Sequence, residues 1–100
     1  MFVGVWDFEV VRHGYERGLI AKNSILKRIK LAEAGDFGDC VPIGDGVSEM
    51  RLHAGPGYRI YFCQEGKYLY LLLIGNAKGT KIAQTRDVRR AKSIKRKHGL

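Results

Sequence analysis

The chain has 100 residues, of which 45% are hydrophobic, and its formal net charge at neutral pH is +8. This length predicts one domain over residues 1–100, and the hydrophobic content predicts a folded chain rather than a disordered one. The apolar run YLYLLLIG is far shorter than a membrane span of roughly 20 residues. Residues 1–10 lack the basic start and apolar run of a secretory signal, so we expect a cytoplasmic protein with no membrane contact.

The positive charge indicates a polyanionic partner, which can be nucleic acid, a ribosome or an acidic protein. The alternative is a basic protein that has no nucleic-acid role. Cys40 and Cys63 form no CxxC or Cys/His pattern. We therefore expect free thiols in a reducing compartment, no metal site and no cofactor.

The first half of the chain contains one clear helix. Residues 1–18 are compatible with a strand or a helix, and the choice stays open. Residues 19–34 are predicted to be helical, with Ile25, Ile29 and Ala32 on one face and Gly35 as the C-cap. Residues 35–46, GDFGDCVPIGDG, are predicted to form a loop because Gly, Asp and Pro dominate them.

Three predicted strands follow, over 47–53, 58–64 and 67–74, and then a basic helix over 85–98. Thr85 is the expected N-cap of this helix, and its inner side is expected to carry Val88, Ala91 and either Ile94 or Lys95. The predicted fold is an α+β domain, a small antiparallel sheet with helices packed on one face.

Strand register is predicted from the two hairpin loops. An odd loop over 53–57 separates an apolar face from a polar one, whereas an even loop mixes them. The apolar face then pairs Leu52 with Tyr58, Met50 with Ile60, and Ser48 with Phe62, while the polar face pairs Arg51 with Arg59 and Glu49 with Tyr61. A two-residue loop at Glu65 and Gly66 would set Leu69, Leu71 and Leu73 opposite Phe62, Ile60 and Tyr58.

The polar face is expected to be open to solvent, and its two arginines require an explanation. Like charges directly opposite one another destabilise a sheet. In one interpretation Glu49 neutralises both Arg51 and Arg59. In the other, the pair binds a phosphate and the neighbouring Tyr61 and Tyr70 offer faces on which bases stack.

The central motifs resemble those of a known family. GDFGD, VPIGDGVSEMRL, GPGYRIYF, LLLIG, Gln84 and RDVRRAK are similar to the addiction-module killer branch of the RelE/HigB-type toxins, from about Ile25 to Lys92. The resemblance implies the toxin of a bacterial type II toxin–antitoxin module. Its expected fold is RelE-like, its activity is metal-independent mRNA cleavage on ribosomes, and its partners are mRNA, the ribosome and a cognate antitoxin protein.

The same resemblance implies roles for particular residues. Arg51 and Arg59 match the family's arginines and would bind the phosphate and stabilise the transition state. Glu49, Tyr61 and Lys78 are the candidates for proton transfer or substrate positioning. Independently of the resemblance, RNA contacts are expected from Tyr70, Lys81, Arg86, Arg89 and Arg90. The alternative for the basic residues from Arg86 onward is a solvated helix exterior.

This chain departs from the family pattern at its N-terminal third, at Ala77 and at Cys40. Two other functions therefore stay open. One is a non-catalytic inhibitor on the same scaffold, such as a DNA gyrase poison. The other is a basic RNA-binding module without turnover.

Overall fold

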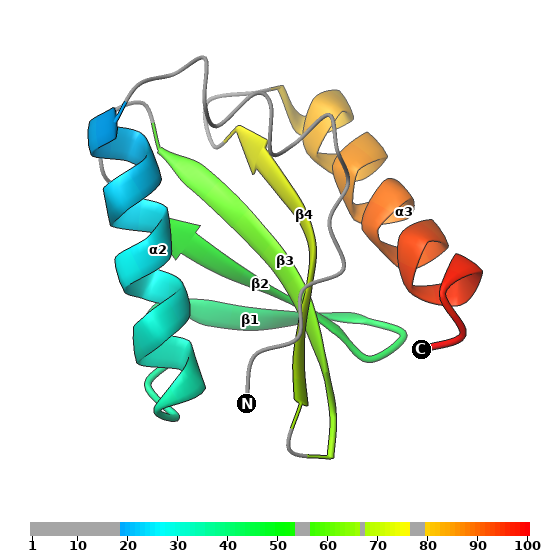
Figure 1. Ribbon diagram of the computed structural model, residues 1–100. Coiled ribbons are helices and arrows are strands. Elements are labelled where there is room, and N and C mark those ends of the chain that lie inside the picture. The colour runs from blue at the N-terminus through cyan, green and yellow to red at the C-terminus, as the bar shows by residue number, and fades with distance from the viewer. Residues whose placement is uncertain (1–18, 54–56, 67, 77–79) are drawn as a thin grey trace.

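The computed structural model describes residues 19–53, 57–66, 68–76 and 80–100. In order, the elements are α2 (Leu19–Glu33), β1 (Cys40–Gly44), β2 (Val47–Leu52), β3 (Tyr58–Glu65), β4 (Tyr68–Asn76) and α3 (Lys81–Lys97). The strands form one antiparallel sheet in the order β1-β2-β3-β4, and the two helices lie beside it (Figure 1). This confirms the predicted α+β class. The alternatives weighed for residues 1–18 lie outside the described residues.

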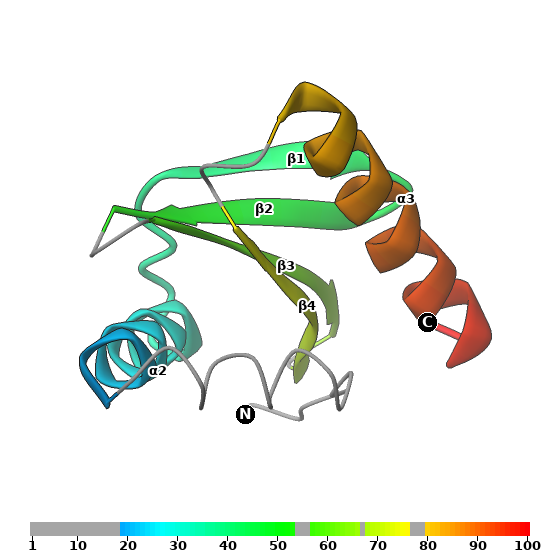
Figure 2. The same cartoon turned by 90° about the horizontal axis from the view of Figure 1, so that it is seen from above.

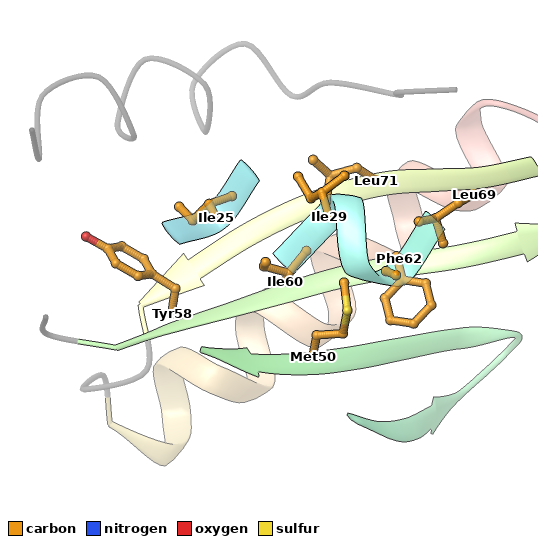
Figure 3. Close-up of a cluster of buried hydrophobic side chains, with 9 residues drawn as sticks. Ile25, Ile29, Met50, Tyr58, Ile60, Phe62, Leu69 and Leu71 are labelled. Atoms are coloured by element: carbon orange, nitrogen blue, oxygen red, sulfur yellow. The ribbon is translucent and has the colours of Figure 1, made fainter. Parts of the chain in front are cut away.

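Helix α2 buries the predicted apolar stripe and ends where its sequence predicts. Ile25, Ile29 and Ala32 are buried, and Ile25 and Ile29 point toward the side chains of the central strands (Figure 3). Gly35 takes a left-handed φ of 92°. Its N–H donates to the carbonyl of Ala32, and the N–H of Asp36 donates to that of Leu31. These two hydrogen bonds form a Schellman C-cap, which glycine adopts without a Cβ clash.

Strand β1 lies within the segment that we predicted to be a loop. Cys40 to Gly44 pair with β2, and Val41 lies opposite Glu49. The connection to β2 is an Asp-Gly turn, in which Asp45 has φ 56° and Gly46 has φ 76°. Two consecutive left-handed residues are typical of a type I′ hairpin, and Asp-Gly is among its preferred sequences. The prediction was wrong because the density of Gly and Pro obscured this hairpin.

The register between β2 and β3 is the predicted one. Leu52 lies opposite Tyr58 and Met50 opposite Ile60, as the odd loop requires. Arg51 and Arg59 are therefore direct cross-strand neighbours.

The predicted register between β3 and β4 is wrong. Glu65 pairs with Tyr68 instead of forming the turn, and Phe62 lies opposite Leu71. A bulge then leaves Leu72 without a partner in the ladder, so that Tyr61 lies opposite Leu73. One extra residue reverses which face the following side chains occupy. Both Leu72 and Leu73 consequently join the cluster beneath α3 rather than the one beneath α2.

The two helices lie on opposite faces of the sheet, which corrects the prediction that both cover one face (Figure 2). The predicted inner side of α3 is right, since Val88, Ala91 and Ile94 pack on the sheet. They cover an apolar surface formed by Val47, Cys63, Leu72 and Leu73. That surface would otherwise be exposed to water, so burying it under α3 is favourable.

Helix α3 begins at Lys81, four residues before the predicted start, and its N-cap is Thr80. The Thr80 hydroxyl accepts a hydrogen bond from the N–H of Ala83 at 3.1 Å. We expect Thr80→Ala to lower the free energy of unfolding by about 1 kcal/mol, because an N–H at the helix start loses its acceptor. Thr85→Ala is the matched control, since Thr85 lies inside the helix and only donates to the carbonyl of Lys81. Urea denaturation of both variants tests this, and equal losses would contradict the assignment.

Candidate functional site

The two arginines converge on one carboxylate. Glu49 Oε1 lies 3.2 Å from Arg51 Nε and 3.7 Å from Arg59 Nε. The Glu49 side chain is 1% exposed, whereas that of Arg59 is 16% exposed and that of Arg51 is 46% exposed. Glu49 thus forms the bridge that the neutralisation interpretation requires. One carboxylate facing two guanidinium groups leaves an excess of one positive charge. Of the two arginines, Arg51 is the one that faces solvent.

Helix α3 supplies a further contact to this carboxylate. Gln84 Nε2 donates to Glu49 Oε2 at 3.4 Å. Both oxygens of the buried Glu49 are therefore engaged, one by the arginines and one by the amide. Burying a carboxylate is costly unless it is paired and hydrogen-bonded, and this arrangement supplies both kinds of contact.

Tyr61 lies opposite Glu49 and is fully buried. Its hydroxyl is enclosed and makes no hydrogen bond of ordinary geometry within the described residues. Burial raises the pKa of Tyr61 well above its usual value, and the Glu49 and Asp87 carboxylates raise it further. The tyrosine is therefore a neutral phenol at physiological pH. The prediction that Glu49 and Tyr61 are open to solvent is wrong, because α3 covers that part of the face.

The residues predicted to contact RNA fall into two groups. Lys81, Arg86 and Arg89 line an outward-facing hollow of about 500 Å³ on α3, together with Ile82 and Thr85. Arg90 is also exposed on this helix.

Tyr70 is separated from the arginine pair along the sheet. It is half-buried and pairs with Cys63, whereas Arg59 pairs with Gly75. Cys63 and Arg59 are four positions apart on β3, so Tyr70 lies about 13 Å along the sheet from Arg59 at about 3.3 Å per residue. The structure therefore does not bring Tyr70 to the arginines.

Two inward-facing polar residues of α3 were not predicted as site residues. Gln84 contacts Glu49, and Asp87 lies near enough to Tyr61 to affect its pKa. Their spacing of three places both on one side of a helix, next to the apolar Val88 and Ala91. Two polar residues beside an apolar stripe were the signal available in the sequence.

The predicted site residue Lys78 lies outside the described residues. Within the described part of the chain, no three His, Cys, Asp or Glu side chains gather as metal ligands, and no helix is long and apolar enough to cross a membrane. The contacts around the Glu49 carboxylate define the candidate site, which consists of Arg51, Arg59, Glu49, Tyr61 and Gln84.

No protein-family model matches this chain. An uncharacterized protein of Haemophilus influenzae (strain Rd KW20) is 38% identical to it over 84 residues. The match covers 84% of this chain and 82% of the Haemophilus protein.

Proposed function

This chain belongs to the same protein family as the Haemophilus influenzae protein, and we propose that it is the toxin of a bacterial type II toxin–antitoxin module. Its activity is metal-independent cleavage of mRNA on translating ribosomes. One observation carries the proposal: a cross-strand arginine pair shares a single buried carboxylate, and one of the two guanidinium groups is open to solvent. The sequence resemblance to the RelE/HigB-type toxins supports the same function.

The arginine pair suits a reaction at a phosphodiester. In the proposed step the ribose 2′-oxygen bonds to phosphorus while the bond from phosphorus to the 5′-oxygen breaks. The 2′-hydroxyl proton leaves to a base, and a proton is delivered to the departing 5′-oxygen. Negative charge increases on the phosphoryl oxygens in the transition state, and guanidinium groups held in place beforehand stabilise it.

The burial of the neighbouring groups assigns them different parts in this proposal. Arg51 meets the phosphate directly because its side chain is 46% exposed. Glu49 and Tyr61 act from beneath, since both are buried and Glu49 fixes the two guanidinium groups through their Nε atoms. For proton transfer we keep Lys78 as the candidate that the family resemblance implies.

The outward face of α3 provides the second part of the proposed RNA surface. Lys81, Arg86 and Arg89 share one hollow there, and the helix has no acidic residue on its first turn. Each phosphate that these cations neutralise adds to the salt dependence of binding. The same positive surface suits an acidic antitoxin protein, which we propose silences the toxin.

We expect Arg51→Ala to lower the rate of RNA cleavage by at least about 100-fold, because it removes a charged group that stabilises the transition state. The fold should persist, since Glu49 keeps its contacts with Arg59 and Gln84. The measurement is growth and mRNA 5′-end mapping after expression of the chain, alone and with the product of the neighbouring gene.

Lys30→Ala is the matched control, because Lys30 is an exposed cation on α2 and its loss changes the net charge equally. A folded Arg51→Ala variant that remains fully toxic would contradict the proposal. Intact transcripts accompanied by DNA damage would instead favour the gyrase inhibitor, and salt-dependent RNA binding without new 5′ ends would favour the RNA-binding module.

A further inference from the structure

A glycine lies beside the arginine pair on the neighbouring strand and leaves a side-chain-sized space over the sheet. Gly75 on β4 lies directly opposite Arg59. Its φ is not in the left-handed region, so the backbone here does not require glycine. A Cβ at this position would lie 2.7 Å from Asp87 Oδ2 and 3.4 Å from Tyr61 Cε2. The space that a side chain would occupy is thus taken by the carboxylate of Asp87, which reaches in from α3.

Asp87 is an unusual residue for its location. It is the only acidic residue in the 17-residue helix α3. Aspartate is a poor helix former in a helix interior. Burial raises its pKa, while the positive charges of Arg86, Arg90 and Arg59 act in the opposite direction. A carboxylate that faces the sheet despite this desolvation needs a reason beyond solubility.

We propose that Asp87 is a positioning residue for Arg59, with its carboxylate in the space that Gly75 leaves free; this inference rests on the proposed function. Arg59 then lies between two carboxylates from different elements, Glu49 on β2 and Asp87 on α3. Arg51 contacts Glu49 and remains the more exposed of the two arginines. The pair is thereby divided into a fixed guanidinium and an accessible one.

One turn of α3 both contacts the Glu49 carboxylate and carries the Asp87 carboxylate. Gln84 donates to Glu49 at 3.4 Å, and Asp87 follows three residues later on the same side of the helix. Docking of α3 therefore sets the geometry of the arginine pair from both sides. Cleaving RNA requires such preorganisation, because donors that must reorient during the reaction lose much of their effect.

The test is Asp87→Asn, which preserves shape and removes the charge. In ¹⁵N-labelled protein without RNA, we expect the Arg59 Nε–H to exchange with water several-fold faster than in the parent chain. The Arg51 Nε–H should be unchanged, because it is hydrogen-bonded to Glu49 at 3.2 Å, whereas Arg59 Nε lies 3.7 Å from the same oxygen and depends on Asp87 for its position. Asp45→Asn is the control: Asp45 Oδ2 lies 3.7 Å from Lys92 Nζ of α3, so this variant also removes a carboxylate contact to the helix.

A second variant fills the space that Gly75 leaves free. Gly75→Ala should accelerate Arg59 Nε–H exchange as Asp87→Asn does, because the added methyl group displaces the carboxylate. Its lowering of the melting temperature should largely disappear in an Asp87→Ala background, where the methyl group has room. In RNA cleavage by the same Asp87→Asn protein, kcat should fall while KM does not rise, because losing a negative charge does not weaken the attraction between the protein and RNA.

The outcomes separate the two proposals. An Arg59 signal that does not respond to Asp87→Asn, or that responds equally to Asp45→Asn, would overturn the positioning role. So would a response confined to Arg90, since Asp87 would then serve only its own helix. A parent chain that cleaves no RNA would end the proposed function while leaving the exchange result for Arg59 intact.

Discussion

Replacing Ile60 by alanine is expected to lower the free energy of unfolding by about 2–5 kcal/mol, the usual cost of such a truncation in a packed core. Ile60 is 0% exposed and lies at the centre of the sheet, where it pairs with Met50 and Ile74. On the α2 side it belongs to the cluster that contains Ile25 and Ile29 (Figure 3). Removing three carbons there leaves a cavity that neighbours on three elements must close.

Ile82→Ala makes the same chemical change where the surroundings are different. Ile82 is 78% exposed on α3, so its truncation should alter the free energy of unfolding by no more than about 0.5 kcal/mol. Alanine also favours a helix slightly more than isoleucine does. Guanidinium denaturation followed by circular dichroism compares the two variants. Similar midpoints for both would mean that the α2 cluster is not the principal core.

The β2–β3 hairpin was predictable because its two faces differ in chemistry. Only an odd loop sets Met50 opposite Ile60 while keeping Arg51 beside Arg59, and the structure has that register. The alternation of apolar and charged residues thus determines the pairing without reference to tertiary contacts.

The register of β4 could not be predicted in the same way. From Leu69 to Ile74 the strand is apolar at almost every position, so a shift of register moves one apolar side chain into the place of another. The bulge at Leu72 is compatible with this sequence because both faces of β4 are buried, one under α2 and one under α3. Tertiary packing, rather than local alternation, determines which leucine faces which helix.

The candidate site was predictable in its sheet residues and not in its helix residues. Cross-strand pairing predicted that Glu49, Arg51, Arg59 and Tyr61 share one face. That α3 covers part of this face follows from contacts distant in sequence, between Ala91 and residues such as Val47. Gln84 and Asp87 enter the site only through that docking. Neither their spacing nor their charge indicates which carboxylate or arginine they meet.

The second large effect is expected at Glu49. Glu49→Ala should lower the free energy of unfolding by about 3 kcal/mol, at the lower end of the cost of breaking a buried ion pair because Arg51 is partly solvated. The variant removes the one carboxylate that both arginines touch and leaves like charges facing each other across two strands. It also removes the acceptor of Gln84, and with it a polar link between α3 and the sheet.

Glu49→Gln and Glu65→Ala separate the causes of this loss. Glutamine preserves size and one carbonyl acceptor, so its loss of stability should be smaller than that of alanine, and it reports the loss of the charge together with one acceptor oxygen. Glu65 is an exposed acidic residue at the end of β3, and its truncation should cost no more than about 0.5 kcal/mol. Urea denaturation at constant ionic strength provides the three values. Equal stabilities of the Glu49→Ala and Glu65→Ala variants would show that the arginine pair does not need its carboxylate.

The same Glu49 variants test how the arginines function. If Glu49 only neutralised them, its removal would strengthen their interaction with a phosphate and cleavage would rise. If Glu49 positions them, single-stranded RNA binding should persist or tighten, because a negative charge is lost, while cleavage by the folded fraction falls. Binding and cleavage measured on one preparation of Glu49→Gln therefore separate charge balance from geometry. We expect retained binding with reduced cleavage, because both guanidinium groups are held through their Nε atoms by a single oxygen of Glu49.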